Sequence, residues 1–202
     1  MPLQHPLRRP TLLSIVACLA LGCSGAPRGG STKPDPTSGT QPFGGKAQAL
    51  PGVVEAEHFD EGPEGKAFAD ADPQNQGAPY RQTSVDIEPR SDASGGYGVG
   101  WTKAGEWLVY TVEIAESGTY KLEVPAASAG NGGTFHIEVD GADRTGPIQV
   151  PNTGSWQKLQ TISKDGIRLD SGRRLLRVVM DTEGETKSVG DMDYFRFTRT
   201  GP

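Results

Sequence analysis

From about residue 53 onward the chain repeats one pattern, a short run in which apolar and polar residues alternate and then a turn rich in Gly, Asn, Asp or Pro. In GTYKLEV, for example, Tyr120, Leu122 and Val124 alternate with Lys121 and Glu123. Because successive side chains of a strand point to opposite faces, this alternation predicts a half-buried strand. The same pattern predicts strands in GTFHIEVDG and at residues 147–150, 157–162, 174–181 and 192–198. No segment sustains a helical period, so we expect an all-β fold, a sandwich or a barrel.

Two of the three tryptophans of the chain lie in one glycine-rich stretch, GGYGVGWTKAGEWLVYTV. In the strand that begins at Trp107, one face carries Leu108, Tyr110, Val112 and Ile114. Trp107 belongs to the opposite face, and its place in the pattern predicts a core residue. Residues 102–105 read as a turn, so Trp101 is expected at the end of a strand. The third tryptophan, Trp156, follows the turn Asn152-Thr153-Gly154 and no strand pattern requires it in the core.

The N-terminal segment has the features of an export signal. Arg8 and Arg9 precede an apolar run at residues 12–21, which is too short and wrongly flanked for a membrane-spanning helix. We therefore predict a signal peptide at residues 1–22. Ala20-Leu21-Gly22-Cys23 resembles the lipobox of bacterial lipoproteins, with the first two residues in swapped order. The resemblance implies that Cys23 is lipidated, and a simple secreted protein is the alternative.

Composition separates a tether from one domain. Residues 23–50 are rich in Gly, Pro, Ser and Thr and poor in large apolar residues, which predicts a flexible tether. Residues 51–202 have the length of a single domain. Removal of the signal peptide takes away two arginines and no acidic residue, so the formal charge changes from −5 to −7. An acidic chain without a Lys/Arg cluster argues against nucleic acid as a partner. The folded part contains no cysteine, which excludes disulfides and cysteine-ligated metals.

Three acidic residues share strand faces with phenylalanines. Glu55 and Glu57 alternate in phase with Phe59, and Asp193 alternates in phase with Phe195. An isolated buried carboxylate is unfavourable, so these groups must be paired, protonated or bound to a metal. The first and last strands of a sandwich commonly lie side by side, and oxygen ligands outside the cell favour Ca²⁺. The alternative is that the strand ends are exposed and their acids solvated.

Seven motifs in order connect these features to a known family. They are VEAEHFDEGPEG, NQGAPYR, SVDIE, DASGGYGVGWTKAGEWLVYTV, GGTFHIEVDG, VPNTGSWQKLQT and DMDYFRF. Together they resemble a family 6 carbohydrate-binding module over residues 53–198. The resemblance implies a jelly-roll β-sandwich of the galactose-binding type, a structural calcium and a sugar site in the loops at one edge. The long polar region at residues 60–94 is expected to contribute functional loops.

The resemblance also implies roles for individual residues. Trp101 and Trp156 stand where the family places two aromatic side chains that clamp a sugar ring, which suits the C–H faces of a pyranose. Glu88 stands where an acidic residue contacts sugar hydroxyls. Asp191 replaces the asparagine of the family, and a carboxylate cannot donate as an amide does. Tyr97 is expected either to widen the platform or to pack under the turn. Glu55, Glu57 and Asp193 match the family's calcium ligands.

Catalysis has little support in the sequence. No nucleophile motif, zinc motif or P-loop occurs, and one binding domain leaves no room for a catalytic domain. A carboxylate pair such as Glu88 with Asp191 leaves a small glycosidase as a minor alternative. We therefore expect a non-catalytic, monomeric protein that binds β-linked polysaccharide of the β-glucan, xylan or agar type. It is expected as an exported bacterial lipoprotein at the outer membrane or cell surface, in contact with the membrane only through its lipid. An interaction protein, in which the sandwich binds a protein or the cell's own envelope glycans, is the main alternative.

Overall fold

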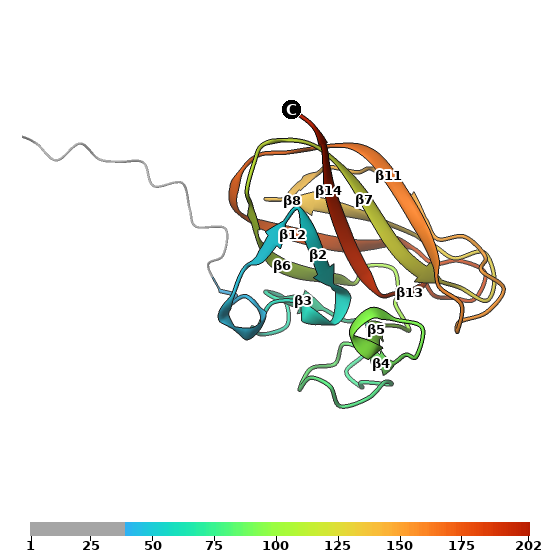
Figure 1. Cartoon of the computed structure of the whole chain (residues 1–202). Helices are drawn as coiled ribbons and strands as arrows, with labels where there is room; N and C mark the ends of the chain where they lie inside the picture. The colour runs from blue at the N-terminus through green and yellow to red at the C-terminus, as the bar shows by residue number, and fades with distance from the viewer. Residues whose placement is uncertain (1–38) are drawn as a thin grey trace, which may run out of the picture. The chain divides into compact units, whose positions relative to one another are not determined.

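The computed structural model describes residues 39–202, which form two β-sheets packed against each other (Figure 1). Helical structure in this range is limited to short 3₁₀ turns, η1 (Phe43–Gly45), η2 (Ala56–His58) and η3 (Ser94–Gly96). The all-β sandwich expected from the alternating pattern is thus confirmed. The predicted signal peptide at residues 1–22, Cys23 and the first part of the tether lie outside the described residues. Within residues 39–202, no helix has the length and apolar character needed to cross a membrane.

The first sheet carries one wall of the core. In spatial order it consists of β1 (Gln48–Leu50), β6 (Trp107–Ile114), β12 (Gly172–Thr182), β8 (Thr134–Val139) and β10 (Ile148–Gln149), with β3 (Phe68–Ala69) on β6 and β9 (Ala142–Asp143) on β8. β6 and β12 run antiparallel over eight paired positions, from Trp107↔Val179 to Ile114↔Gly172.

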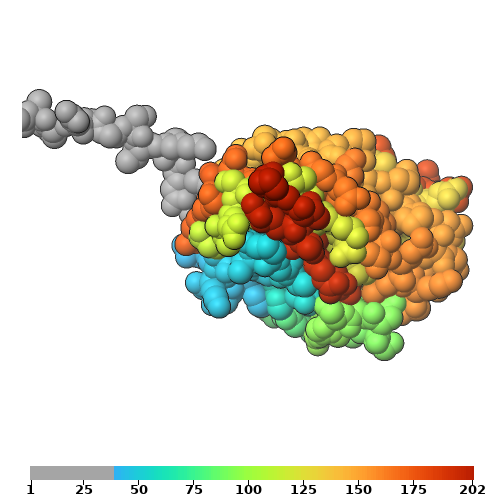
Figure 2. Space-filling model, turned by 45° about the horizontal axis from the view of Figure 1, so that its top comes forward, coloured from blue at the N-terminus to red at the C-terminus, as the bar shows by residue number. Residues whose placement is uncertain are grey.

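The second sheet brings the ends of the domain together. In spatial order it consists of β2 (Gly52–Glu55), β14 (Tyr194–Gly201), β7 (Gly118–Ala127), β13 (Asp191–Met192), β5 (Tyr97–Val99) and β4 (Ile87–Pro89), with β11 (Gln160–Leu169) on β7. β2 and β14 are antiparallel neighbours, with Glu55 paired to Tyr194. Figure 2 shows the red C-terminal strand directly beside the cyan segment that contains β2. The expected contact between the first and last predicted strands is therefore present.

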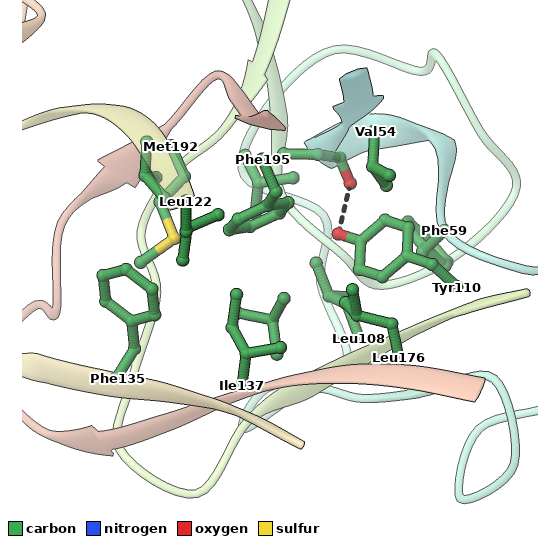
Figure 3. Packing of buried hydrophobic residues seen from close by; sticks show 14 of the residues in the cluster. Val54, Phe59, Leu108, Tyr110, Leu122, Phe135, Ile137, Leu176, Met192 and Phe195 are labelled. Carbon is green, nitrogen blue, oxygen red and sulfur yellow. Dashed lines mark hydrogen bonds between the residues drawn. The ribbon is translucent and has the colours of Figure 1, made fainter. Parts of the chain in front are cut away.

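The core lies between the two sheets and follows the alternation read from the sequence. Leu108 and Ile137 of the first sheet meet Leu122 and Phe195 of the second (Figure 3). Tyr110 is fully buried, its ring lies 5.8 Å from that of Phe195, and its hydroxyl donates a hydrogen bond of 2.8 Å to the carbonyl of Ala56. This bond holds η2, and with it Glu57, at the edge of the core.

The predicted strands differ from the observed ones mainly at their ends. β11 begins at Gln160 rather than at 157 and continues to Leu169 past a register shift between Lys164 and Ile167. The segment predicted at 192–198 is divided into β13 and β14, with Asp193 between them. Glu57 also leaves the expected pattern, because the chain turns into η2 after Glu55 instead of continuing as a strand.

The tether predicted for residues 23–50 is wrong at its C-terminal end. The backbones of Gln41 and Glu61 exchange two hydrogen bonds, and the Phe43 ring stacks on that of His58 at 4.2 Å. β1 then pairs in parallel with β6 and buries Leu50. The small and polar residues around β1 show no alternation, so the strand depends on its partner rather than on its own sequence.

The core role predicted for Trp107 is also wrong. Its side chain is half-buried on the outer face of the first sheet, where the Arg177 guanidinium lies 5.4 Å from the ring centroid. Leu108, the next residue, points into the core. The outer position follows from the strand alternation itself, and the aromatic ring is partly covered by an arginine rather than by the opposite sheet.

Candidate functional site

Four of the predicted sugar-binding residues come together at one cleft. Trp101, Trp156, Glu88 and Asp191 all line a cavity of about 300 Å³, a size within the usual range of ligand pockets. They come from four separate places in the second sheet and its loops: the end of β5, the segment before β11, β4 and β13. The remaining lining residues are Lys103, Gln157, Thr186, Lys187 and Ser188.

Trp101 is held in an unusual position. Its side chain is 39% exposed, and its backbone has φ +50°, in the left-handed region that residues other than glycine seldom adopt. The next residue fixes this geometry, because the buried Thr102 hydroxyl donates to the Gly190 carbonyl at 2.7 Å and accepts from the Gly190 N–H at 3.1 Å. A large aromatic side chain kept exposed on a strained backbone is typical of a binding site rather than of a structural residue.

Trp156 is half-buried on a short irregular segment. Its turn is closed by a hydrogen bond of 2.8 Å from the Gly154 N–H to the Asn152 side chain. The buried Thr153 hydroxyl accepts from the Ser128 N–H at 3.0 Å and anchors the turn to the end of β7. The ring is therefore carried by a loop whose backbone is tied down on one side.

The two carboxylates of the cleft are linked by an arginine that sequence reasoning did not identify. The same nitrogen of Arg90, Nη1, donates to Glu88 Oε1 at 2.6 Å and to Asp191 Oδ2 at 3.0 Å. The Arg90 side chain is fully buried. Burial and the neighbouring Glu88 carboxylate raise the pKa of Asp191 to about 7, although Arg90 acts in the opposite direction. Because both carboxylates accept a hydrogen bond from one nitrogen, they lie side by side in the cleft.

Tyr97 is not among the residues that line this cleft. Its ring packs against that of Tyr80, with centroids 4.3 Å apart, and the Tyr80 hydroxyl lies 2.9 Å from His58 Nε2. The ring of Tyr97 thus packs against Tyr80 and the hydrophobic core and does not line the cleft. His136, the second histidine of the described residues, lies on the outer face of β8 with its Nδ1 2.7 Å from Asp181 Oδ1.

The three predicted metal ligands lie around Ser94. Both carboxylate oxygens of Glu55 accept from the Ser94 hydroxyl, at 2.9 and 2.8 Å, and both oxygens of Asp193 accept from its N–H, at 3.0 and 3.1 Å. Glu57 is 1% exposed and its Oε2 atom is buried without a hydrogen-bond partner. Burial, with smaller contributions from the nearby carboxylates of Glu55 and Asp193, raises the pKa of Glu57 to about 7.

The residue types of this group suit a calcium ion, but their present arrangement is not that of a formed metal site. An orphaned buried carboxylate oxygen beside two further acids is the oxygen-only, negatively charged environment that Ca²⁺ prefers. Gly95 lies against the group, since a Cβ atom there would come within 3.3 Å of Glu57 Oε1. However, no three His, Cys, Asp or Glu side chains of residues 39–202 are arranged as ready metal ligands.

Comparison with known families identifies the domain. The sequence model of "Carbohydrate binding module (family 6)" matches residues 78–199. Among curated proteins, the chain is 35% identical over 95 residues to the clotting factor G alpha subunit of Tachypleus tridentatus. This match covers 46% of the chain and 14% of that relative, so the chain spans only a small part of the relative's length.

Solved structures of similar modules support the same assignment. A β-1,3-glucan-binding family 6 module from Bacillus halodurans aligns with a TM-score of 0.57 and 23% identity, over 77% of this chain and 100% of that one, and shows the fold. The C-terminal family 6 module of a marine laminarinase from Zobellia galactanivorans gives 0.55 and 25%, over 73% and 98%. A module from Cellvibrio mixtus lichenase 5A, solved in complex with cellotriose, gives 0.54 and 26%, over 74% and 97%.

Proposed function

The chain belongs to family 6 of the carbohydrate-binding modules, and we propose that it binds β-linked polysaccharide in the cleft between Trp101 and Trp156. The family is one of non-catalytic binding modules. The observation that carries the proposal is Trp101, an exposed indole on a left-handed backbone that lines the same cleft as a second tryptophan and two carboxylates. Indole faces pack against the C–H faces of a pyranose, while carboxylate oxygens accept hydrogen bonds from its hydroxyls.

We propose β-glucan as the first ligand class, with xylan and agar as further candidates. Two relatives at 25% identity or above support this choice: the module of a laminarinase and the module solved with cellotriose. Glu88 and Asp191 add hydrogen-bond acceptors to the cleft, which suits a neutral sugar rich in hydroxyl donors.

The sequence feature that would favour an interaction protein with a repurposed cleft is Asp191. Asp191 departs from the asparagine of the family, but its charge is met by Arg90 at 3.0 Å. A cleft whose acids are held in this way retains acceptors for a ligand. We therefore do not propose a protein partner as a second function.

Affinity electrophoresis of the full chain tests the proposed function. The protein is run in gels that contain laminarin, barley β-glucan, xylan or agarose, beside Trp101→Ala and Trp156→Ala. The third tryptophan provides a matched control, because Trp107 lies outside the cleft. Retardation of the wild type and Trp107→Ala, with loss of retardation in both cleft variants, supports the proposal. Migration unaffected by every polysaccharide refutes it.

We also propose that Glu55, Glu57 and Asp193 hold a structural Ca²⁺. The support is the orphaned oxygen of Glu57 and the position of all three acids where β2 meets β14. The ion would tie these two strands together by charge neutralisation. Export and lipid attachment at Cys23 likewise remain proposals, and many copies on one membrane would bind a polysaccharide with increased avidity.

A further inference from the structure

Arg90 contacts the two carboxylates of the cleft and the loop that carries Trp156, and its own side chain is excluded from solvent. Its guanidinium makes five hydrogen bonds, which use all five of its N–H donors. Nη1 binds Glu88 and Asp191, Nε and Nη2 bind the two oxygens of Asp92 at 3.1 and 3.0 Å, and Nη2 also donates to the Trp156 carbonyl at 2.7 Å. No donor is left for a ligand, so Arg90 cannot act by touching one.

We infer that Arg90 is a positioning residue of the sugar cleft, which fixes the backbone of Trp156 relative to the carboxylates of Glu88 and Asp191. The inference rests on the proposed function. It adds that one buried side chain sets the distance between the Trp156 loop and the two carboxylates of the cleft.

The loop that carries Trp156 depends on Arg90 for its position. Residues 151–159 contain no strand, and Thr153 anchors only the start of the segment. Beyond the tryptophan, the Leu159 N–H donates to Asp92 Oδ2 at 3.3 Å, and this carboxylate is itself held by Arg90. Removal of the guanidinium therefore releases the loop both at Trp156 and at Leu159.

The surrounding chain makes space for this one side chain. A Cβ atom at Gly98 would come within 2.8 Å of Arg90 Cδ, so the strand beside the arginine needs a glycine. A Cβ atom at Gly100 would come within 3.1 Å of Asp191 Oδ1 and 3.7 Å of Glu88 Oε1. Gly98 and Gly100 thus let the arginine and the acids approach the backbone of β5 and of the residue before Trp101.

Charge explains why the arginine and Asp191 belong together. Glu88, Asp92 and the buried Asp191 would repel one another, and the one buried guanidinium of Arg90 pairs with all three. Loss of one partner of a buried ion pair leaves an uncompensated charge and is strongly unfavourable. Lysine offers three donors on a single nitrogen and cannot reproduce the planar fork of arginine.

The test compares two buried arginines. Arg90→Lys keeps the charge and loses the fork. Arg81→Lys is the matched control, because Arg81 is also buried, binds the carbonyls of Glu57, Phe59 and Asp60, and does not line the cleft. Each full-chain variant is titrated with a β-1,3-glucan hexasaccharide by calorimetry, and its folded fraction and melting temperature are measured by circular dichroism. Arg90→Met with Asp191→Asn is a second, charge-balanced variant.

We expect both lysine variants to have a lower melting temperature than the wild type. Only Arg90→Lys should lose affinity for the hexasaccharide, by about tenfold or more. Equal affinity of Arg90→Lys and Arg81→Lys at full folding overturns the inference. The double variant should fold and should still bind weakly, since neutral side chains do not hold the Trp156 carbonyl. Wild-type binding by the folded double variant also overturns it.

A readout without sugar separates this inference from the proposed function. The indole N–H resonance of Trp156, assigned through Trp156→Phe, should shift or broaden in Arg90→Lys and stay unchanged in Arg81→Lys. If the wild type binds no glycan, the proposed function fails and the resonance still decides the role of Arg90. An unperturbed Trp156 resonance in Arg90→Lys refutes the positioning role in either case.

Discussion

The Thr102 hydroxyl both donates to the carbonyl of Gly190 and accepts from its N–H, at 2.7 and 3.1 Å. The Val189 N–H donates in addition to the Thr102 carbonyl at 2.9 Å. These bonds connect the residue after Trp101 to the residue before Asp191. One aromatic and one acidic residue of the cleft are thereby fixed to each other through their backbones.

Thr102→Val should therefore weaken both folding and binding. The variant leaves the buried Gly190 groups without partners, which is expected to lower the free energy of unfolding by about 1–3 kcal/mol. Trp101 loses its anchor, so affinity should fall as well. Thr111→Val is the control, since its buried hydroxyl bonds Asp60 away from the cleft. Urea unfolding and calorimetry measure the two effects, and an affinity loss of equal size in the control contradicts the prediction.

Replacement of Trp101 by glycine and by alanine should separate strain from binding. Either change removes the exposed ring and should reduce affinity by about thirtyfold, as for a typical binding hot spot. Glycine adopts positive φ without strain, whereas alanine retains a Cβ atom at φ +50°. Trp101→Gly should consequently be more stable than Trp101→Ala by about 1 kcal/mol. Equal melting temperatures would show that the left-handed backbone costs nothing.

The sequence predicted those parts of the fold that depend on local alternation. Tyr120, Leu122 and Val124 are buried as their period of two requires. Trp101 and Trp156 could be singled out because no strand needed them in the core, and the family resemblance brought them to one site. Both lie in the observed cleft.

The missed features depend on contacts between distant segments. Arg90 follows a short strand in a polar region, where a charged residue is normally solvated, and its burial requires Gly98 and Asp191 from other strands. A positive charge two residues after Glu88 was the available signal, because side chains two apart on a strand share a face. β1 was missed because parallel pairing with β6, rather than its own pattern, makes it a strand.

Calcium should stabilise the protein through Glu57. At a concentration about a hundred times its dissociation constant, a bound ion adds about 2.7 kcal/mol to the free energy of unfolding. Glu57→Gln should lose most of this response, because the orphaned carboxylate oxygen becomes part of a neutral amide. Asp86→Asn is the matched control, a buried acid outside the group around Ser94. Melting curves with calcium and with a chelator provide the measurement, and an unchanged melting temperature of the wild type counts against the site.

Stability should decline as pH rises toward neutrality, in part through Glu106. Its carboxylate accepts from the N–H groups of Lys103 and Ala71, at 2.9 and 3.1 Å, and so holds the turn after Trp101. Burial raises the pKa of Glu106 to about 7, with smaller contributions from the carboxylates of Asp70 and Asp86, while the two N–H groups act in the opposite direction. Burial likewise raises the pKa of Asp86 to about 6.

The sign follows from proton binding. Between the unfolded pKa of 4.5 and the folded value of about 7, the folded state binds more protons at Glu106 than the unfolded state. The free energy of unfolding therefore falls as pH rises through this interval, and the contribution is constant below and above it. The pKa values of Glu57 and Asp191 are also raised, so they contribute to the same decline in stability. Only a difference in slope between variants isolates the contribution of Glu106. Glu106→Gln should flatten the decline between pH 5 and 7, whereas Glu113→Gln, at an exposed position of β6, should leave it unchanged. Urea titrations across this range measure the slopes, and identical slopes in wild type and Glu106→Gln would show that Glu106 remains ionised in the fold.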